Sequence, residues 1–303
     1  MTSISSHEEV ESALPNWLAA LCQRLVASPE LDELLVNGGK SLVEIDRHGK
    51  SLFRAVPVPA GDLLISTQDF VADQGLRLDP LHPFAGGQLR VGAVLLRWHA
   101  VIPPVSPDGV VLSLRRHRFE ELSLTVFDWE APELLGRLHE TFENRGALLV
   151  AGPTGVGKTT LLNAWLQHFA RTRRVVILER LAEIPAAHDS WVRLVEKDRN
   201  ADGAGSFSLN EIFRQSLRLR PDLLVVGEIR GSEADVFLEA AATGHQCVAA
   251  TIHAACAKTA WARLMSSVRS SRRKALAAEI RGRVTVVSML RRSKPSVVAV
   301  ERL

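Results

Sequence analysis

The chain has 303 residues, of which 46% are hydrophobic and 23% are charged, a balance typical of a globular protein. This length is sufficient for two domains with separate cores, and no apolar run reaches the length that a membrane-spanning helix needs. The N-terminus, MTSISSHEEV, lacks the basic start and apolar core of a signal peptide, and three cysteines suit neither a disulfide framework nor a zinc site. We therefore expect a cytoplasmic globular protein.

The net charge of +3 is unevenly distributed along the chain. Residues 263–294 contain ten lysine or arginine residues and one acid, Glu279, so this stretch carries +9 and the remainder carries −6. Such a basic stretch is most often a solvated surface or a surface that faces another subunit. It also leaves open a contact with anionic lipid, with an acidic membrane partner or with nucleic acid.

The first 130 residues are predicted to form a small α+β domain. Residues 8–27 have the pattern of an amphipathic helix. Short apolar runs bounded by turn residues follow and indicate strands: ELLVN, SLVEID and SLFRAV, then AVLLRWHAVI and GVVLSLRR. The segment DWEAPE indicates a linker, which we place at residues 131–138, with Pro132 near the first turn of a new helix.

From residue 139 to residue 303 we expect an α/β domain with a parallel sheet. Continuous apolar runs alternate here with helical segments, and such runs are typical of strands buried on both faces of a sheet. The runs are ALLVAG, RVVILE, DLLVVGE and CVAATIH. The last two segments, RVTVVSMLRR and KPSVVAVERL, indicate a β-hairpin.

The segment GPTGVGKTT, residues 152–160, matches the phosphate-binding pattern G-x-x-x-x-G-K-[ST] between a predicted strand and a predicted helix. Backbone N–H groups of such a turn surround the β-phosphate of a nucleotide at the positive end of the helix. We expect Lys158 to reach the β- and γ-phosphates and the Thr159 hydroxyl to bind Mg²⁺. The predicted nucleotide-binding residues of the loop are Gly152, Pro153, Thr154, Gly155, Val156, Gly157, Lys158, Thr159 and Thr160.

Polar residues follow the other predicted strands, at the edge where an open parallel sheet binds its ligands. Glu179 follows the second strand, Glu228 and then Arg230 follow the third, and His253 ends the fourth. One carboxylate can hold Mg²⁺, another can orient or deprotonate an attacking water, and a histidine or arginine can contact the γ-phosphate. These parts together predict the hydrolysis of a nucleotide.

Several segments resemble the ATPases of type II and type IV secretion systems and of type IV pili. LRLRPDLLVVGEIRGSEA (217–234) is similar to their Walker B segment, TGHQCVAATIHA (243–254) to their histidine box and ILERLAEI (177–184) to their acidic box. RLVEKDRNADGAGSFSLNEIFRQSLRLRPD resembles the approach to Walker B in the branch of tight-adherence (Flp) pili and conjugation motors. ELLVNGG and HAVIPPVSPDGVVLSLRR extend the resemblance into the N-terminal part, so that it covers roughly residues 28–254.

The resemblance implies a PAS-like N-terminal domain followed by a RecA-like ATPase domain that uses ATP and Mg²⁺. It also implies a homo-hexamer in the cytoplasm, peripherally associated with the inner membrane through a platform protein of a pilus or secretion system. The catalytic residues that match by position are Lys158, Glu179, Glu228, Arg230, His253 and the N-domain residue Arg115. Arg116 and His245 are implied to join the nucleotide-binding residues, and Thr159 and Glu228 to bind the metal.

The sequence departs from the family pattern at Arg180, where an aspartate is usual after the acidic-box glutamate, and at Lys197, where an arginine is usual. Because neighbouring side chains at a strand end point to opposite sides, we expect Arg180 to point away from the water that Glu179 orients. Its expected partner is Glu183 or a neighbouring subunit.

Two other functions stay open alongside an ATP-hydrolysing motor for pilus assembly or secretion. The first is a nucleic-acid-dependent translocase, which the scattered aromatic residues and the lack of tyrosine disfavour, because single-strand binding grooves use stacked aromatic side chains. The second is a catalytically silent nucleotide-binding regulator, in which Arg180 has abolished turnover. DNA-stimulated, salt-sensitive turnover would favour the first, and ATP binding without turnover the second.

Overall fold

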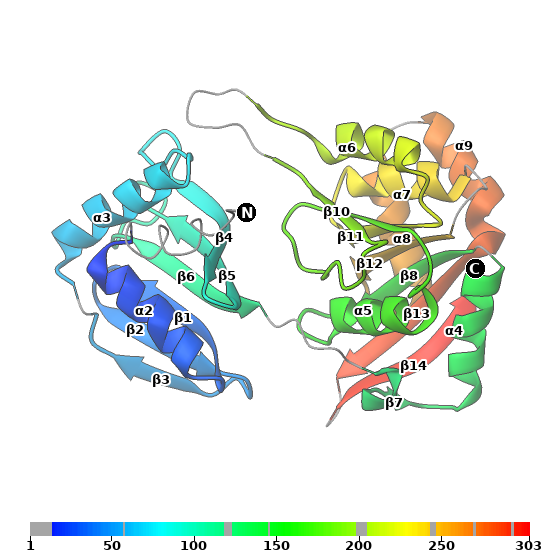
Figure 1. Ribbon diagram of the computed structural model, residues 1–303, viewed down its shortest axis with the longest axis horizontal. Helices are drawn as coiled ribbons and strands as arrows, with labels where there is room; N and C mark the ends of the chain where they lie inside the picture. Colours follow the sequence, from blue (N-terminus) through cyan, green and yellow to red (C-terminus); the bar gives the residue numbers. More distant parts are fainter. Residues whose placement is uncertain are drawn as a thin grey trace, which may run out of the picture. The chain divides into compact units, whose positions relative to one another are not determined.

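The computed structural model describes residues 14–56, 58–117, 123–144, 146–197, 205–242, 247–268, 271–291 and 294–303 (Figure 1). The chain divides into two compact units. The described residues up to 117 belong to the first unit, and those at 123–197 and 207–303 belong to the second. Each unit has an apolar core of its own.

The first unit is built around a six-stranded antiparallel sheet. Its strands have the order β3-β2-β1-β6-β5-β4 and are β1 (Leu31–Asn37), β2 (Ser41–Asp46), β3 (Ser51–Arg54), β4 (Phe84–Val91), β5 (Val94–Val101) and β6 (Val111–His117). The segments AVLLRWHAVI and GVVLSLRR, both predicted to be strands, form β5 and β6, which pair with each other. On the inner side of β1, Leu34 and Val36 are buried, in the alternating pattern of a sheet with one covered face.

Two helices contribute to the core of the first unit, α2 (Asn16–Ala27) and α3 (Ala60–Asp73). Helix α2 begins directly after Pro15, which agrees with the C-terminal part of the helix predicted at 8–27; residues 8–13 lie outside the described part of the chain. Helix α3 is not predicted from the sequence. It buries Leu63 and Phe70, and the Phe70 ring packs edge-on against Trp98 of β5.

The second unit contains an eight-stranded sheet with the order β10-β9-β11-β12-β8-β13-β14-β7. Its strands are β7 (Asp128–Trp129), β8 (Ala147–Gly152), β9 (Val175–Glu179), β10 (Val192–Val195), β11 (Leu223–Ile229), β12 (Cys247–His253), β13 (Val284–Arg291) and β14 (Pro295–Arg302). Neighbours from β10 to β13 run parallel, whereas β13 and β14 form an antiparallel pair. The predicted parallel sheet and terminal hairpin are therefore confirmed.

Helices cover both faces of this sheet (Figure 1). On one face lie α4 (Glu133–Glu143) and α5 (Lys158–Phe169), and on the other α6 (Leu209–Ser216), α7 (Glu233–Ala242), α8 (Ala257–Ser267) and α9 (Ser271–Ile280). Short 3-10 turns occur at η1 (Leu124–Val126), η2 (Leu217–Leu219) and η3 (Arg281–Arg283). Among the described helices, none has both the length and the apolar character to cross a membrane.

The interval 131–138, expected to be a linker, lies inside the second unit. Strand β7 precedes it and pairs with β14, and α4 begins within it, directly after Pro132. The physical reason is the apolar face of α4, which places Leu134 and Leu138 in the same core as α5. The first boundary between the two units along the described chain therefore comes before residue 123, and residues 205–206 belong to the first unit again.

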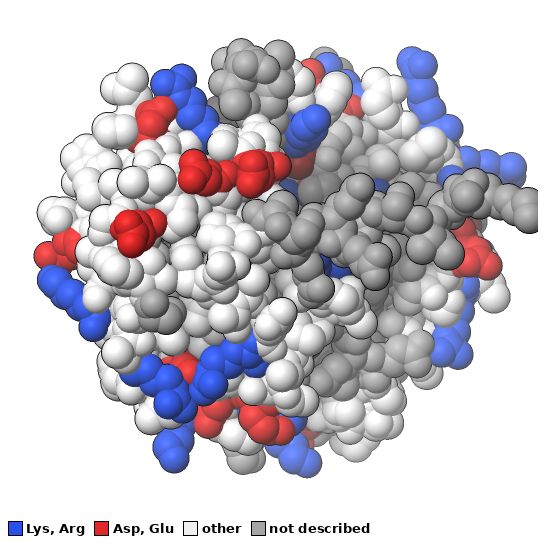
Figure 2. All heavy atoms as spheres, turned by 60° about the vertical axis from the view of Figure 1, so that its left-hand side comes forward, with Lys and Arg blue, Asp and Glu red and all other residues white. Residues whose placement is uncertain are grey.

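Figure 2 shows one face of the molecule, on which charged side chains lie around a broad area with few charges. Side chains of both signs lie near one another at the margins of that area. A mixture of this kind is typical of a solvated surface.

Candidate functional site

The phosphate loop joins β8 to α5, as the motif predicts. Gly155 and Gly157 have φ values of 72° and 97°, in the left-handed region that glycine adopts without steric cost. Gly152 is required for a different reason, because an added Cβ would lie 2.7 Å from a Val156 methyl group and 3.1 Å from the Met289 carbonyl oxygen. The loop thus turns tightly over β13 and presents its backbone to the N-terminus of α5, where anions bind.

Lys158 is the first residue of α5, and its side chain is buried. Its Nζ donates to the Pro153 carbonyl oxygen at 3.0 Å and lies 3.3 Å from Nδ1 of His253. The Thr154 hydroxyl lies 3.4 Å from the same ring nitrogen. Burial lowers the pKa of Lys158, and the nearby Glu228 carboxylate acts in the opposite direction. A phosphate group brought to the loop would therefore meet a partly desolvated ammonium group.

A β-bulge at Gly227 decides where Glu228 points. Val226 pairs with Ala250 of β12, but Glu228 pairs with Thr251 rather than Ile252, so Gly227 is an extra residue in β11. Paired residues of neighbouring strands share a face, and Thr251 and His253 are two residues apart on the same face. The bulge therefore turns Glu228 toward the face of His253, which is also the face that α5 covers.

Four charged or ionisable side chains meet on this face, and we call Lys158, Glu228, Arg230 and His253 the Glu228 cluster. Nε2 of His253 lies 2.6 Å from Oε1 of Glu228, and Arg230 donates from Nε and Nη2 to Oε2 at 2.8 and 2.5 Å. Burial and the Lys158 ammonium lower the pKa of His253, which favours a neutral ring. The 2.6 Å contact is poorly aligned for a hydrogen bond, so Oε1 of Glu228 is a buried acceptor without an aligned donor.

Glu179 ends β9, the strand next to β11, and lies in a different environment. The side chain is 4% exposed, and its Oε1 accepts from the backbone N–H groups of Glu183 and Ile184 at 3.1 and 3.0 Å. Oε2 is buried and has no hydrogen-bond partner among the described residues. Burial raises the pKa of Glu179 to about 8. This carboxyl group therefore exchanges its proton close to neutral pH, as a general base does.

The space for Glu179 exists because residue 227 is glycine. A Cβ at that position would lie 3.0 Å from Cγ and 3.2 Å from Oε1 of Glu179. We call Glu179, Gly227 and the two backbone N–H groups the Glu179 pocket. Val175 and Ile177 of β9 belong to the core on the α5 face, and alternation along the strand puts Glu179 on that face too. Glu179 and the Glu228 cluster thus share one face of one sheet edge.

The side chain of Arg180, the residue after β9, points away from that of Glu179. It pairs with Glu233 at the start of α7 and, at 3.4 Å, with Glu196 after β10. Glu233 is 1% exposed and also accepts from the backbone N–H of Gly231 at 2.7 Å. The expected direction of Arg180, away from Glu179, agrees with these contacts. Within the described chain these two partners take the place of the expected Glu183, because the fold brings α7 and β10 to the end of β9. A partner on a neighbouring subunit stays a prediction.

The two arginines predicted from the N-terminal part belong to the first unit. Arg116 donates from its guanidinium to the carbonyl oxygens of Leu31 and Ser28, both at 3.2 Å, and is thus held within that unit. Arg115 is exposed on β6 and forms no ion pair with any described residue. Their approach to a nucleotide stays a prediction. His245 lies outside the described residues.

Arg263 of α8 is a candidate that the sequence motifs do not identify. A cavity of about 700 Å³ adjoins Arg230 and His253 and is lined by Arg263 and its neighbours on α8. The positive charge of Arg263 also lowers the pKa of His253 and of Lys158. In the sequence it is only the first residue of the basic stretch. The one signal that singles it out is its place on the helix that follows His253.

Comparison with known proteins finds a family that matches the part of the chain carrying this site. A profile described as type II/IV secretion system protein matches residues 88–293. TrbB of Sinorhizobium fredii, named for conjugal transfer, is 30% identical over 270 residues, which cover 87% of this chain and 80% of TrbB. A Mycobacterium tuberculosis protein named for conjugal transfer is 41% identical over 186 residues, or 59% of this chain. The chain spans about half, 53%, of that relative.

Solved structures have the same architecture at low sequence identity. The ATPase DotB of Legionella pneumophila has a TM-score of 0.64 and 19% identity, with 91% of this chain and 77% of DotB covered. The pilus retraction motor PilT with bound ADP has a TM-score of 0.63 and 19% identity, with 89% of this chain and 77% of PilT covered. These structures share the fold of this chain, and the predicted α/β domain preceded by a smaller α+β domain is confirmed.

Proposed function

Because the chain belongs to the type II/IV secretion system protein family, we propose that it is an ATP-hydrolysing motor that powers pilus assembly or protein or conjugative secretion. The observation that carries this proposal is the Glu228 cluster at the phosphate loop, with Glu179 on the neighbouring strand. Phosphoryl transfer to water requires a loop that binds the phosphates, cations near the transferred group and a base that activates the water.

Binding of ATP rearranges the contacts of Lys158. In the structure its Nζ is held by the Pro153 carbonyl oxygen and lies beside His253. Phosphate oxygens are stronger partners for an ammonium group than a carbonyl or a neutral imidazole. Lys158 therefore turns to the β- and γ-phosphates, and His253 loses one neighbour. The change at His253 gives the site a means to register the γ-phosphate.

The residues present fit a magnesium ion bound together with ATP. Thr159 lies in the first turn of α5, and Glu228 keeps a buried oxygen, Oε1, without an aligned donor. Thr159 and Glu228 would hold the ion, and when bound it neutralises charge that develops on the phosphate oxygens. Arg230 meanwhile fixes the second oxygen of Glu228, so that the carboxylate keeps its orientation.

Glu179 orients and deprotonates the water molecule that attacks the γ-phosphate. The backbone N–H groups of Glu183 and Ile184 fix one carboxyl oxygen, and the other has no partner among the described residues. In its ionised form that free oxygen orients a water molecule toward the γ-phosphate and accepts its proton. Burial makes Glu179 a stronger base than an exposed glutamate, because it disfavours the ionised form.

The assembly is proposed from family membership. The motor is a cytoplasmic homo-hexamer that docks at an inner-membrane platform protein, in the branch of tight-adherence pili and conjugation. Arg115 of the N-terminal domain completes the site when the domains close on ATP. The basic stretch at 263–294 offers a contact to an anionic membrane surface.

The decisive experiment measures phosphate release from Mg·ATP by the purified full-length chain. We expect steady turnover in the wild type and none in Lys158→Ala, with Lys50→Ala, an exposed lysine of the first unit, as the matched control. Equal turnover in Lys158→Ala and wild type would refute the site. A wild-type chain that binds ATP but does not turn it over, even with its membrane partner, would favour the silent regulator. Stimulation by DNA that salt abolishes would favour the translocase.

A further inference from the structure

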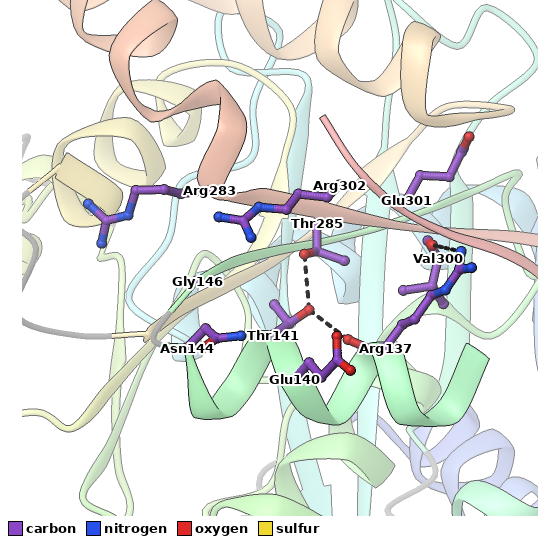
Figure 3. A pocket seen from close by; sticks show the side chains of 10 residues that line it. All are labelled: Arg137, Glu140, Thr141, Asn144, Gly146, Arg283, Thr285, Val300, Glu301 and Arg302. Atoms are coloured by element: carbon purple, nitrogen blue, oxygen red, sulfur yellow. Dashed lines mark hydrogen bonds between the residues drawn. The ribbon is translucent and has the colours of Figure 1, made fainter. Parts of the chain in front are cut away.

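A second polar pocket lies at the opposite edge of the eight-stranded sheet (Figure 3). It has a volume of about 520 Å³ and is formed by α4, the starts of β8 and β13, and the end of β14. Gly146 in its wall precedes the first residue of β8, whereas the phosphate loop follows the last. The length of β8 therefore separates the two sites, and both can be occupied at once.

Three arginines from three elements line this pocket, and none has a carboxylate partner among the described residues. Arg137 of α4 donates to the Val300 carbonyl oxygen at 3.5 Å, and Arg302 of β14 donates to the Gly282 carbonyl oxygen. Arg283, at the end of η3, forms no hydrogen bond or ion pair with any described side chain or carbonyl. Since a guanidinium carries five N–H donors, most of these donors are left for a ligand.

The walls of the pocket are fixed. Thr141 of α4 and Thr285 of β13 are both buried, and their hydroxyl groups are 3.0 Å apart (Figure 3). Gly146 closes the wall, because an added Cβ would lie 3.1 Å from the Arg283 carbonyl oxygen and 3.3 Å from that of Thr141. The arginines therefore extend from a packed frame to which α4, η3 and β14 each contribute one.

Two of the three arginine side chains extend to the same side of the pocket (Figure 3), whereas Arg137 extends toward Val300. In Figure 3, Arg283 and Arg302 extend in the same direction, on the side of Asn144, and Glu301 points away from them. Glu301 and Arg302 are adjacent on β14, so alternation along the strand explains their opposite directions. Glu140, the other acid of the pocket, pairs with none of the three arginines.

We propose that this pocket binds a ligand through a phosphate group, independently of the ATP at the phosphate loop. Guanidinium groups match phosphate oxygens in paired, charge-assisted hydrogen bonds, and the Asn144 amide adds a neutral donor. The phosphate belongs either to a small soluble ester or to a phospholipid head group. This site goes beyond the ATPase function, and its failure would leave that function untouched.

The test uses the full-length chain with Lys158→Ala as background, which weakens phosphate binding at the loop. Calorimetric titration with inorganic pyrophosphate reports the second site. We expect Arg283→Gln with Arg302→Gln to lower the affinity by at least about tenfold, because charge-assisted hydrogen bonds are lost. Arg171→Gln, which changes an exposed arginine in the turn after α5, is the matched control and should leave the affinity unchanged.

One further variant and one vesicle measurement test the same site. Asn144→Asp adds a negative charge at the exposed C-terminal end of α4 and should weaken binding, and a cooperative thermal transition shows that the variant is folded. Sedimentation with phosphatidylcholine vesicles, with and without phosphatidylglycerol, distinguishes the source: arginine-dependent binding only to the anionic vesicles assigns the site to a lipid phosphate. The proposal is overturned if neither probe binds, or if the arginine variants bind as well as Arg171→Gln.

Discussion

The Glu228 cluster and the Glu179 pocket lie on neighbouring strands of one sheet edge, yet they hold their carboxyl groups in opposite ways. Glu228 has Arg230 on one oxygen and the ring of His253 at the other. Glu179 accepts from two backbone N–H groups and forms no ion pair with any described residue, and burial raises its pKa to about 8. Two glutamates at equivalent strand ends are thus prepared for different chemistry. Glu228 is positioned to interact with cations, whereas Glu179 can take up a proton.

Among the substitutions in the two regions, Glu179→Gln should have the largest effect on kcat. The amide keeps the shape of the side chain but cannot accept a proton, so kcat should fall by about 10²–10⁴-fold. The Glu179 pocket does not include the phosphate loop, so nucleotide affinity should stay close to that of the wild type. Single-turnover phosphate release and nucleotide titration measure the two quantities. A fall in affinity that accounts for the whole loss would show that Glu179 serves binding instead.

Glu228→Gln should also lose turnover, but with a different signature. The amide has no charge to offer a metal ion, and Arg230 and His253 lose their anionic neighbour. We expect a loss of about 10²-fold that excess magnesium partly restores, because the missing contact is to the cation. Magnesium titrations of both glutamine variants measure this. If both variants respond to magnesium alike, the division of roles between the two glutamates is wrong.

Arg115→Ala tests whether the Glu179 pocket, where no described cation forms an ion pair with the carboxyl group, depends on a cation from the first unit. An arginine that reaches the γ-phosphate contributes up to about 10³–10⁵-fold where it acts alone. Because Lys158 and Arg230 share the task here, we expect a loss of about 10–100-fold. Arg90→Ala, on β4 of the same sheet, is the matched exposed control. Equal rates for the two variants would show that Arg115 is not a catalytic cation.

Much of this edge can be predicted from the sequence because it depends on local pattern. The glycines of the phosphate loop and the acids after apolar runs are visible in the chain, and parallel strands bring their carboxyl ends to one edge. Two features are not predictable in this way. The bulge at Gly227 depends on the register between β11 and β12, and Arg180 finds Glu196 and Glu233 only in the folded chain.

The smallest predicted effect concerns stability, and it isolates the Glu179 pocket from the Glu228 cluster. In the chain without nucleotide, burial raises the pKa of Glu179 from its ordinary 4.5 to about 8. Between these values the folded state keeps a proton that the unfolded state has released, so stability from this group is full below 4.5 and is lost as pH rises through about 8.

Glutamine at this position does not titrate. The free energy of unfolding of Glu179→Gln, relative to wild type, should therefore rise steadily with pH across this window. Urea denaturation of both proteins at matched pH values measures the difference, and titrations elsewhere in the chain cancel from it. Glu143→Gln, at the exposed end of α4, is the matched control. A difference that stays constant from pH 5 to pH 8 would mean that Glu179 is already ionised in the folded chain, and its proposed strength as a base would then have no physical origin.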